Sequence, residues 1–181
     1  PQGRWIVYDK DGDKVLADNA TDEDRQYVGN GLPQFTGSMT HTFRYKNIDL
    51  SLFFQTALGF DIFNIHDFYY GTKNFQGNVM DKAYSKNKLI SQNPIVCDYF
   101  LEPGDYLKLS SVNFGYTLNV NKKYVDAIRI YATASNLFTI TKFSGVDPST
   151  YQLNGLNPGA TNSRTYYPST RQFMLGMQID F

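Results

Sequence analysis

Apolar and polar residues alternate along most of this chain, and the spacing of apolar residues that is typical of helices is almost absent. In FTGSMTHTFRY, residues 35–45, one face of an extended strand carries Phe, Met and Tyr side chains, and the other carries Thr and Ser. The stretch LSLFFQTAL, residues 50–58, has the same pattern and follows the short link KNID. Two strands joined by so short a link are expected to form an antiparallel hairpin.

Three more stretches alternate in the same way: residues 106–118, 127–138 and 172–181. The first of them changes phase midway, and a β-bulge near Ser110 would restore the alternation. In the last stretch, large apolar residues share one face: Phe173, Leu175, Met177, Ile179 and Phe181. The sequence therefore predicts an all-β chain with about five antiparallel strands.

The connections between these strands alternate between short and long. The links KNID and NVNKKYVD are short, whereas residues 60–104 and 142–168 form long segments. Long structureless loops are uncommon in compact soluble domains, but outer-membrane barrels have short periplasmic turns and long extracellular loops. If the short links are periplasmic, the fifth strand ends on the same side, so the C-terminus is expected in the periplasm.

Two architectures could produce these strands, a soluble β-sandwich or a transmembrane barrel. The polar faces are rich in Ser, Thr, Asn, Gln and Gly rather than Lys and Glu, and the last strand ends in register at Phe181 without a loose tail. Aromatic residues near strand ends would form the girdles at the membrane interface: Tyr45, Tyr106, Phe138, Phe143 and Phe173. These features favour a barrel. Five strands cannot close one, because even small barrels need about eight, so the sheet must belong to a larger one.

Composition limits the function classes. Lys plus Arg and Asp plus Glu both number 17, and this balance gives no support for a nucleic-acid partner. No apolar run approaches the roughly 20 residues of a membrane-spanning helix. Cys97 is the single cysteine, so no internal disulfide is possible. The chain begins PQGRW, without an initiator Met or a signal peptide, and we expect it to be part of a longer protein.

Motifs that carry chemistry are missing from the sequence. It has no G-x-S-x-G, no P-loop and no H-E-x-x-H, so we expect no enzymatic activity and no cofactor. His41 and His66 are far apart and there is one cysteine, so no metal site is expected. DKDGDK, from Asp9, alternates like an EF-hand loop, but Lys14 stands where that loop needs Gly. A solvated acidic turn is the better interpretation.

The long segments contain clusters of aromatic residues, which are our candidates for contact with a ligand or a partner: Phe68, Tyr69, Tyr70, Phe75, Tyr151, Tyr166 and Tyr167. Aromatic rings stack on sugar faces and pack against partner proteins. The same residues could instead pack the loops together or lie at a membrane interface, and the sequence leaves this alternative open.

Four blocks of the sequence resemble SusC/RagA-type TonB-dependent outer-membrane transporters. They are DRQYVGNGLPQFTGSMTHTFRYKNIDLSLFFQTALGFDIFN, YLKLSSVNFGYTL, IRIYATASNLFTITKFSGVDPS and YYPSTRQFMLGMQIDF. The blocks extend from Asp24 to Phe181 in the order that the family has. A match of four ordered blocks is specific, whereas any single block would be weak.

This resemblance implies the C-terminal part of a barrel of about 22 strands in the bacterial outer membrane. Such transporters are plugged by an N-terminal domain and import oligosaccharides or peptides with energy relayed by TonB, beneath a SusD-like lipoprotein. Residues 1–33 would be a polar extracellular lead-in, and residues 34–181 the last strands, without the plug or the TonB box. The remaining alternative is a soluble all-β module that binds glycan or protein.

The resemblance also suggests a role for the C-terminal strand. In outer-membrane barrels, a terminal aromatic residue in this register resembles the signal that the barrel-assembly machinery reads. The residues implied are those of the apolar face of the last strand: Phe173, Leu175, Met177, Ile179 and Phe181. We expect them to face lipid.

Overall fold

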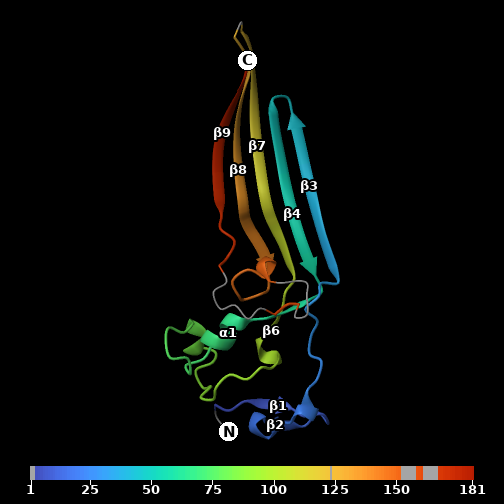
Figure 1. The fold of residues 1–181 in the computed structure, drawn as a ribbon, viewed down its shortest axis with the longest axis vertical. Helices are drawn as coiled ribbons and strands as arrows, with labels where there is room; N and C mark the ends of the chain where they lie inside the picture. Colours follow the sequence, from blue (N-terminus) through green and yellow to red (C-terminus); the bar gives the residue numbers. More distant parts are fainter. Residues whose placement is uncertain (1–2, 123, 152–157, 161–166) are drawn as a thin grey trace.

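A computed structural model describes residues 3–122, 124–151, 158–160 and 167–181 of the chain. Its main feature is an antiparallel sheet of five strands that lie side by side in the order of the sequence (Figure 1). These strands are β3 (Phe35–Tyr45), β4 (Ile48–Leu58), β7 (Tyr106–Lys122), β8 (Val125–Thr141) and β9 (Gln172–Asp180). The prediction of an all-β chain with five antiparallel strands is confirmed.

The two ends of this sheet differ (Figure 1). The short β3–β4 and β7–β8 connections lie at one end together with the C-terminus, which we call the turn end, and the long segments lie at the other, the loop end. The β3–β4 connection is tight, since Tyr45 pairs with Ile48 and Lys46 adopts a positive φ of 51°. With five antiparallel strands, the sequence predicts that the C-terminus lies at the same end as the short links, and the structure agrees.

The long segments at the loop end contain small elements of their own. The strands are β1 (Ile6–Tyr8), β2 (Lys14–Leu16), β5 (Asp61–Phe63) and β6 (Leu101–Pro103). The helices are α1 (Ile65–Tyr70) and the 3-10 turns η1 (Ala17–Asn19), η2 (Asp22–Asp24), η3 (Asp81–Ala83), η4 (Asp98–Phe100) and η5 (Pro148–Thr150). Across the described ranges, no helix has the length and apolarity needed to cross a membrane.

Strand register assembles one apolar face across the whole sheet. One row of paired residues runs Phe43, Leu50, Phe114, Ala132 and Leu175 from β3 to β9. The side chains of this row on the two edge strands are exposed to solvent, Phe43 by 56% and Leu175 by 78%. Contiguous apolar surface of this kind marks contact with another apolar medium or protein. Nothing else in the described residues buries it.

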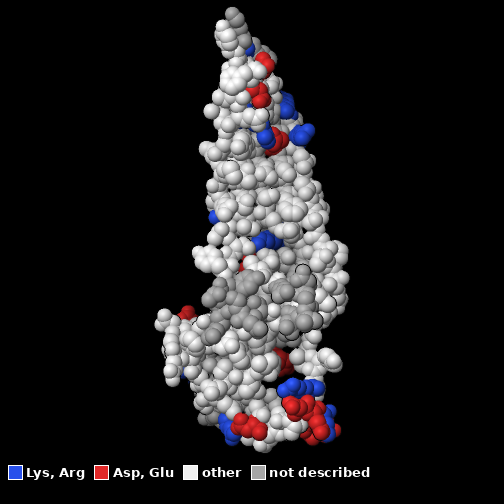
Figure 2. Space-filling model, in the orientation of Figure 1, with Lys and Arg blue, Asp and Glu red and all other residues white. Residues whose placement is uncertain are grey.

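The opposite face of the sheet is polar. The next row runs Thr42, Ser51, Asn113, Thr133 and Met174. Charged residues of the strands lie near strand ends, and residues 109–121 of β7 and 130–141 of β8 contain none. Figure 2 shows the same separation on one face of the molecule, with charges gathered at both ends and a middle band nearly free of them. An uncharged stretch of about 9 to 11 residues is what a strand needs to cross a bilayer.

β7 contains the predicted bulge. Ser111 lies opposite Phe53 of β4 and Leu109 lies opposite Phe54, so Ser110 has no paired residue on β4. The bulge at Ser110 is confirmed. Because one residue is inserted, the residues of β7 before Ser110 lie on the opposite face from the one that unbroken alternation would give them.

A small core forms where the sheet meets the long segments. Its buried members are Ala57, Phe60, Ile62, Phe143 and Tyr151. Phe143 is only 6% exposed, so its expected place in an aromatic girdle at the membrane interface is wrong. It is buried because the segment after β8 folds back onto β5 instead of continuing along the sheet.

The N-terminal segment is attached to the long β4–β7 segment through Trp5. The Trp5 ring lies 5.3 Å from Tyr99 and 5.6 Å from Phe100 between centroids, and its Nε1 donates to the carbonyl of Asn93 at 2.9 Å. The expected polar lead-in therefore has a buried aromatic anchor. The assignment of residues 1–33 as an extracellular lead-in stays a prediction.

Candidate ligand site at the loop end

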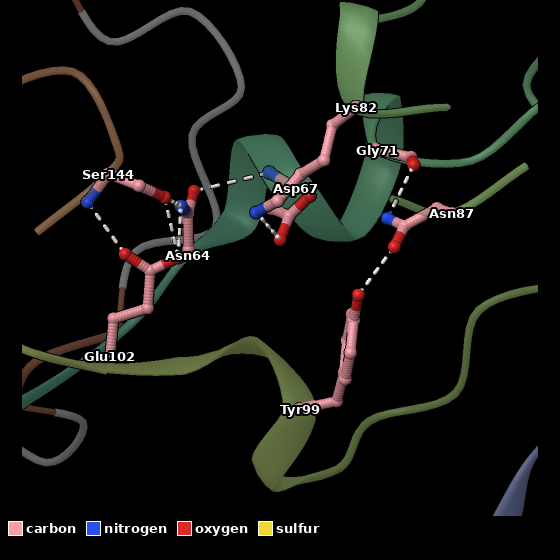
Figure 3. A network of polar contacts seen from close by, with 8 residues as sticks. All are labelled: Asn64, Asp67, Gly71, Lys82, Asn87, Tyr99, Glu102 and Ser144. Carbon is pink, nitrogen blue, oxygen red and sulfur yellow. Dashed lines mark hydrogen bonds and ion pairs between the residues drawn. The ribbon is translucent and has the colours of Figure 1, made fainter. Parts of the chain in front are cut away.

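Helix α1 is short, and its N-terminus is capped by a side chain that also links two other segments. Asn64 Oδ1 accepts the backbone N–H of Asp67 at 3.1 Å. Asn64 Nδ2 donates to Glu102 Oε1 at 3.0 Å and to Ser144 Oγ at 3.3 Å (Figure 3). Because Asn64 is fully buried, α1, β6 and the segment after β8 are held together at one point.

Glu102 completes this junction. The backbone N–H of Ser144 donates to Glu102 Oε2 at 2.6 Å, and the Ser144 hydroxyl donates to Oε1 at 2.7 Å. Burial alone would raise the pKa of Glu102, but hydrogen bonds from Ser144 and Asn64 and the charge of Lys82 outweigh it and hold the pKa below its usual value. The junction is therefore anionic at neutral pH.

The other side of α1 is held by a buried carboxylate. Asp67 is 1% exposed, and Lys82 Nζ lies 2.6 Å from its Oδ2. At the C-terminal end of the helix, Asn87 Nδ2 donates to the carbonyl of Gly71 at 2.8 Å, and the Tyr99 hydroxyl donates to Asn87 Oδ1 (Figure 3). These contacts place the α1 side chains rigidly relative to the segments around them.

Beside α1 lies a hollow of about 450 Å³, which is within the usual size range of ligand pockets. Its walls are His66 and Tyr70 of α1, Asn78, Val79 and Met80 of the following segment, and residues 144–146. The His66 and Tyr70 rings lie 6.4 Å apart between centroids, and His66 Nδ1 is a buried atom without a hydrogen-bond partner in the described residues. The hollow therefore offers mostly apolar contact.

Four of the predicted contact residues come together around α1. Phe68 contacts Tyr69 with a centroid distance of 5.1 Å and Phe100 at 5.3 Å, and Tyr70 contacts Phe75 at 4.8 Å. Of these four, Tyr70 lines the hollow. Phe68 packs against Phe100 of the long β4–β7 segment, which agrees with the alternative that these aromatics pack the loops together.

The remaining candidates are dispersed. Tyr151 is buried against Phe143 with a centroid distance of 5.3 Å, whereas Tyr167 is 76% exposed just before β9. Tyr166 lies outside the described residues. Sequence reasoning did not select Val79, Met80 and Val146, which line the hollow, because they belong to no periodic or aromatic pattern. The one available signal was that His66 stands four residues before Tyr70, on the same face of a helix.

The carboxylate of Asp9 is used within its own acidic turn. Asp9 Oδ1 accepts the backbone N–H groups of Asp11 at 3.0 Å and Asp13 at 2.8 Å, so the carboxylate closes the β1–β2 turn. The interpretation as a solvated acidic turn is confirmed. Within the part of the chain that the structure describes, no group of three His, Cys, Asp or Glu side chains could hold a metal ion.

Sequence comparison finds relatives among curated receptors, while no family model matches the chain. The chain is 28% identical over 174 residues to TonB-dependent receptor P3 of Formosa agariphila, covering 87% of this chain and 17% of the receptor. It is 29% identical over 157 residues to TonB-dependent receptor SusC of Bacteroides thetaiotaomicron, covering 79% of this chain and 15% of SusC. The chain thus spans less than a fifth of the length of these relatives.

Solved structures of the RagAB peptide importer share the fold. The closed-closed state matches with a TM-score of 0.74 at 24% identity, over 97% of this chain and 20% of the matched chain. Another structure of the RagAB peptide transporter matches with a TM-score of 0.77 at 21% identity, over 99% of this chain and 21% of the matched chain. At these identities the likeness establishes the fold.

The relatives and the solved neighbours are receptors and transporters rather than enzymes. They agree with the resemblance carried by the four ordered sequence blocks, and with a sheet that has one open apolar face. Over most of its length the chain is therefore similar to SusC/RagA-type TonB-dependent outer-membrane receptors, and it has the fold of a segment of their β-barrel.

Proposed function

We propose that the complete protein imports oligosaccharides or peptides across the bacterial outer membrane. Energy arrives from TonB through an N-terminal part of the protein outside these residues, and a SusD-like surface lipoprotein presents the nutrient. This chain contributes lumen wall and extracellular loops and catalyses no reaction. The relatives named as TonB-dependent receptors and the importer fold support the proposal.

One observation carries the proposal: among the described residues, no segment covers the apolar face of the sheet, and the middle of its polar face is free of charge. A soluble glycan- or protein-binding module would bury the apolar face against a second sheet. In the described residues the outer side chains of that face stay open, with Phe173 75% and Met177 62% exposed. Lipid on one side and a polar lumen on the other account for both faces.

The orientation follows from the two ends of the sheet. We place the turn end and the C-terminus in the periplasm and the loop end outside the cell, because outer-membrane barrels have short periplasmic turns. Residues 1–33 are then extracellular, and residues 34–181 comprise the last strands with their loops. The apolar face of β9, which ends at Phe181, is the proposed assembly signal.

The hollow beside α1 is the proposed point of contact with nutrient or lipoprotein. It lies at the loop end, and Tyr70 and His66 provide ring surfaces in it. Exposed Tyr167 is the second candidate at this end. Phe68 and Tyr151 are assigned to loop packing, since their rings contact Phe100 and Phe143.

Two neighbouring residues of β8 provide the test. Ala132 belongs to the apolar row and Thr133 to the polar row. Single cysteines, Ala132→Cys and Thr133→Cys, are made in the complete receptor with Cys97→Ser, and intact outer membranes are treated with a charged maleimide. We expect rapid labelling at position 133 and labelling at position 132 only after detergent is added. Equal labelling of both positions without detergent, or a complete receptor that stays monomeric in water, would contradict the proposal.

A further inference from the structure

Lys108, near the loop end of β7, is a buried lysine with a full set of partners. Its side chain is 7% exposed, and its Nζ donates to Ser149 Oγ at 2.7 Å and to Ser169 Oγ at 3.0 Å. The carboxylate of Asp147 lies 3.4 Å away and is itself 9% exposed. Three groups from the long segment after β8 therefore converge on one cation of the sheet.

The bulge at Ser110 is what turns Lys108 towards these groups. Val112 and Phe114 lie on the apolar face, and regular alternation back from them would place Lys108 on that face as well. With Ser110 inserted, Leu109 takes the apolar position opposite Phe54. Lys108 then lies opposite Gln55 on the polar face, so a lysine that would have destabilised the lipid-facing surface is directed inwards.

Asp147 connects this cation to the backbone of the segment. Its Oδ1 accepts the N–H of Ser149 at 2.9 Å and caps η5, and its carbonyl accepts the Thr150 hydroxyl at 2.7 Å. Burial would raise the pKa of Asp147, but hydrogen bonds from Ser149 and Ser169 and the charge of Lys108 hold it below its usual value. The pair is therefore a buried ion pair whose remaining bonding capacity is satisfied, which is the arrangement that such pairs require.

The segment between the two anchors forms a wall of the hollow. Ser144 is held by Glu102 at one end, and Asp147 is held by Lys108 at the other. Gly145 and Val146, between them, line the hollow. A change at either anchor would move this wall.

We infer that Lys108 is a positioning residue that holds residues 144–150 over the polar face of the sheet and so shapes the hollow beside α1. The bulge at Ser110 is the backbone feature that makes this possible. The inference concerns the ligand site of the proposed function, but the position of the segment can be measured whether or not the receptor imports anything. Its failure and the failure of the proposed function are therefore distinguishable.

Amide hydrogen exchange in the complete receptor, purified in detergent, tests the inference. In Lys108→Met we expect the amides of Ser149 and Tyr151 to exchange roughly tenfold faster or more, because local opening becomes easier. The matched control is Lys142→Met, which removes an exposed lysine next to the same segment and should leave exchange unchanged. Unchanged exchange in an assembled Lys108→Met receptor, or an equal effect of Lys142→Met, would overturn the inference.

A second pair of variants covers the case in which Lys108→Met fails to assemble. Lys108→Arg keeps the charge and the donors and should retain most of the protection, whereas Lys108→Gln should lose it. Folding of each barrel is checked by its shifted migration in unheated gels. As a single substitution, Asp147→Asn should make the Ser149 and Tyr151 amides exchange faster. Added to Lys108→Gln, it should increase their exchange little further, because the two residues act as one unit. Additive effects, or equal loss in Lys108→Arg and Lys108→Gln, would count against Lys108 as the anchor.

Discussion

The phenol ring of Tyr131 lies over Gly176 of the neighbouring strand β9, on the polar face of the sheet. The two residues are directly paired, and a Cβ at position 176 would collide with the ring. The ring also contacts Arg129, whose guanidinium lies 5.8 Å from the ring centroid and whose Nη2 donates to Asp49 at 2.7 Å. Because Gly176 has no side chain, the Tyr131 ring fits against β9. From there it contacts Arg129, which is paired with Asp49 of β4.

Gly176→Val should weaken the attachment of β9. Overpacking of this kind costs about 1–3 kcal/mol, because the Tyr131 ring must leave its position. We expect the temperature at which the folded barrel loses its shifted gel migration to fall. Adding Tyr131→Ser should recover most of the loss, since the added methyl groups then have room. A Gly176→Val receptor as heat-resistant as the wild type would show that the close approach is not required.

Lys82→Met should loosen α1. Asp67 would keep a buried charge without its cation, and breaking one side of a buried pair costs about 3–5 kcal/mol. Limited proteolysis of the complete receptor should then cut faster between residues 65 and 90, while Lys88→Met, which removes an exposed lysine, should have no effect. The double variant Lys82→Met, Asp67→Asn should regain part of the resistance. If it were no more resistant than Lys82→Met alone, the unpaired charge would not be the cause.

The junction at Glu102 should weaken in acid. Its pKa is held below the ordinary value of 4.5, so its contribution to stability is complete above that pH and is lost as the pH falls through the lowered pKa. The Ser144 amide, which donates to Glu102 Oε2, should lose protection from hydrogen exchange only below pH 4.5 after correction for the intrinsic rate. In Glu102→Gln that amide should be less protected at neutral pH and largely independent of pH. A loss of protection that begins well above this window would assign the effect to another group.

Phe181→Lys should reduce the amount of receptor at the cell surface without lowering uptake per receptor. A lysine near the membrane interface costs only about 0–1 kcal/mol, so a strong loss would reflect failed recognition during assembly rather than poor burial in lipid. Phe181→Tyr keeps a terminal ring and is the matched control. Normal surface levels with lost uptake would contradict the assembly role.

The sequence by itself determined the strands, their two faces and the bulge. Side chains of a strand alternate with a period of two whatever the neighbours are, so Phe173, Leu175 and Met177 identify a face without any tertiary information. The phase change around Ser110 could be read for the same reason, because inserting one residue inverts a local pattern.

Only the tertiary structure decided the loop end. Lys108 and Asp147 meet although 39 residues separate them, and Asn64 bonds Ser144 across 80. Such contacts have no period, because they depend on where whole segments fold back onto the sheet. The same folding buries Phe143 and Tyr151, which the sequence placed at a girdle and at a ligand site. The strands could therefore be predicted from local pattern, whereas the hollow beside α1 exists only once segments distant in the sequence have packed together.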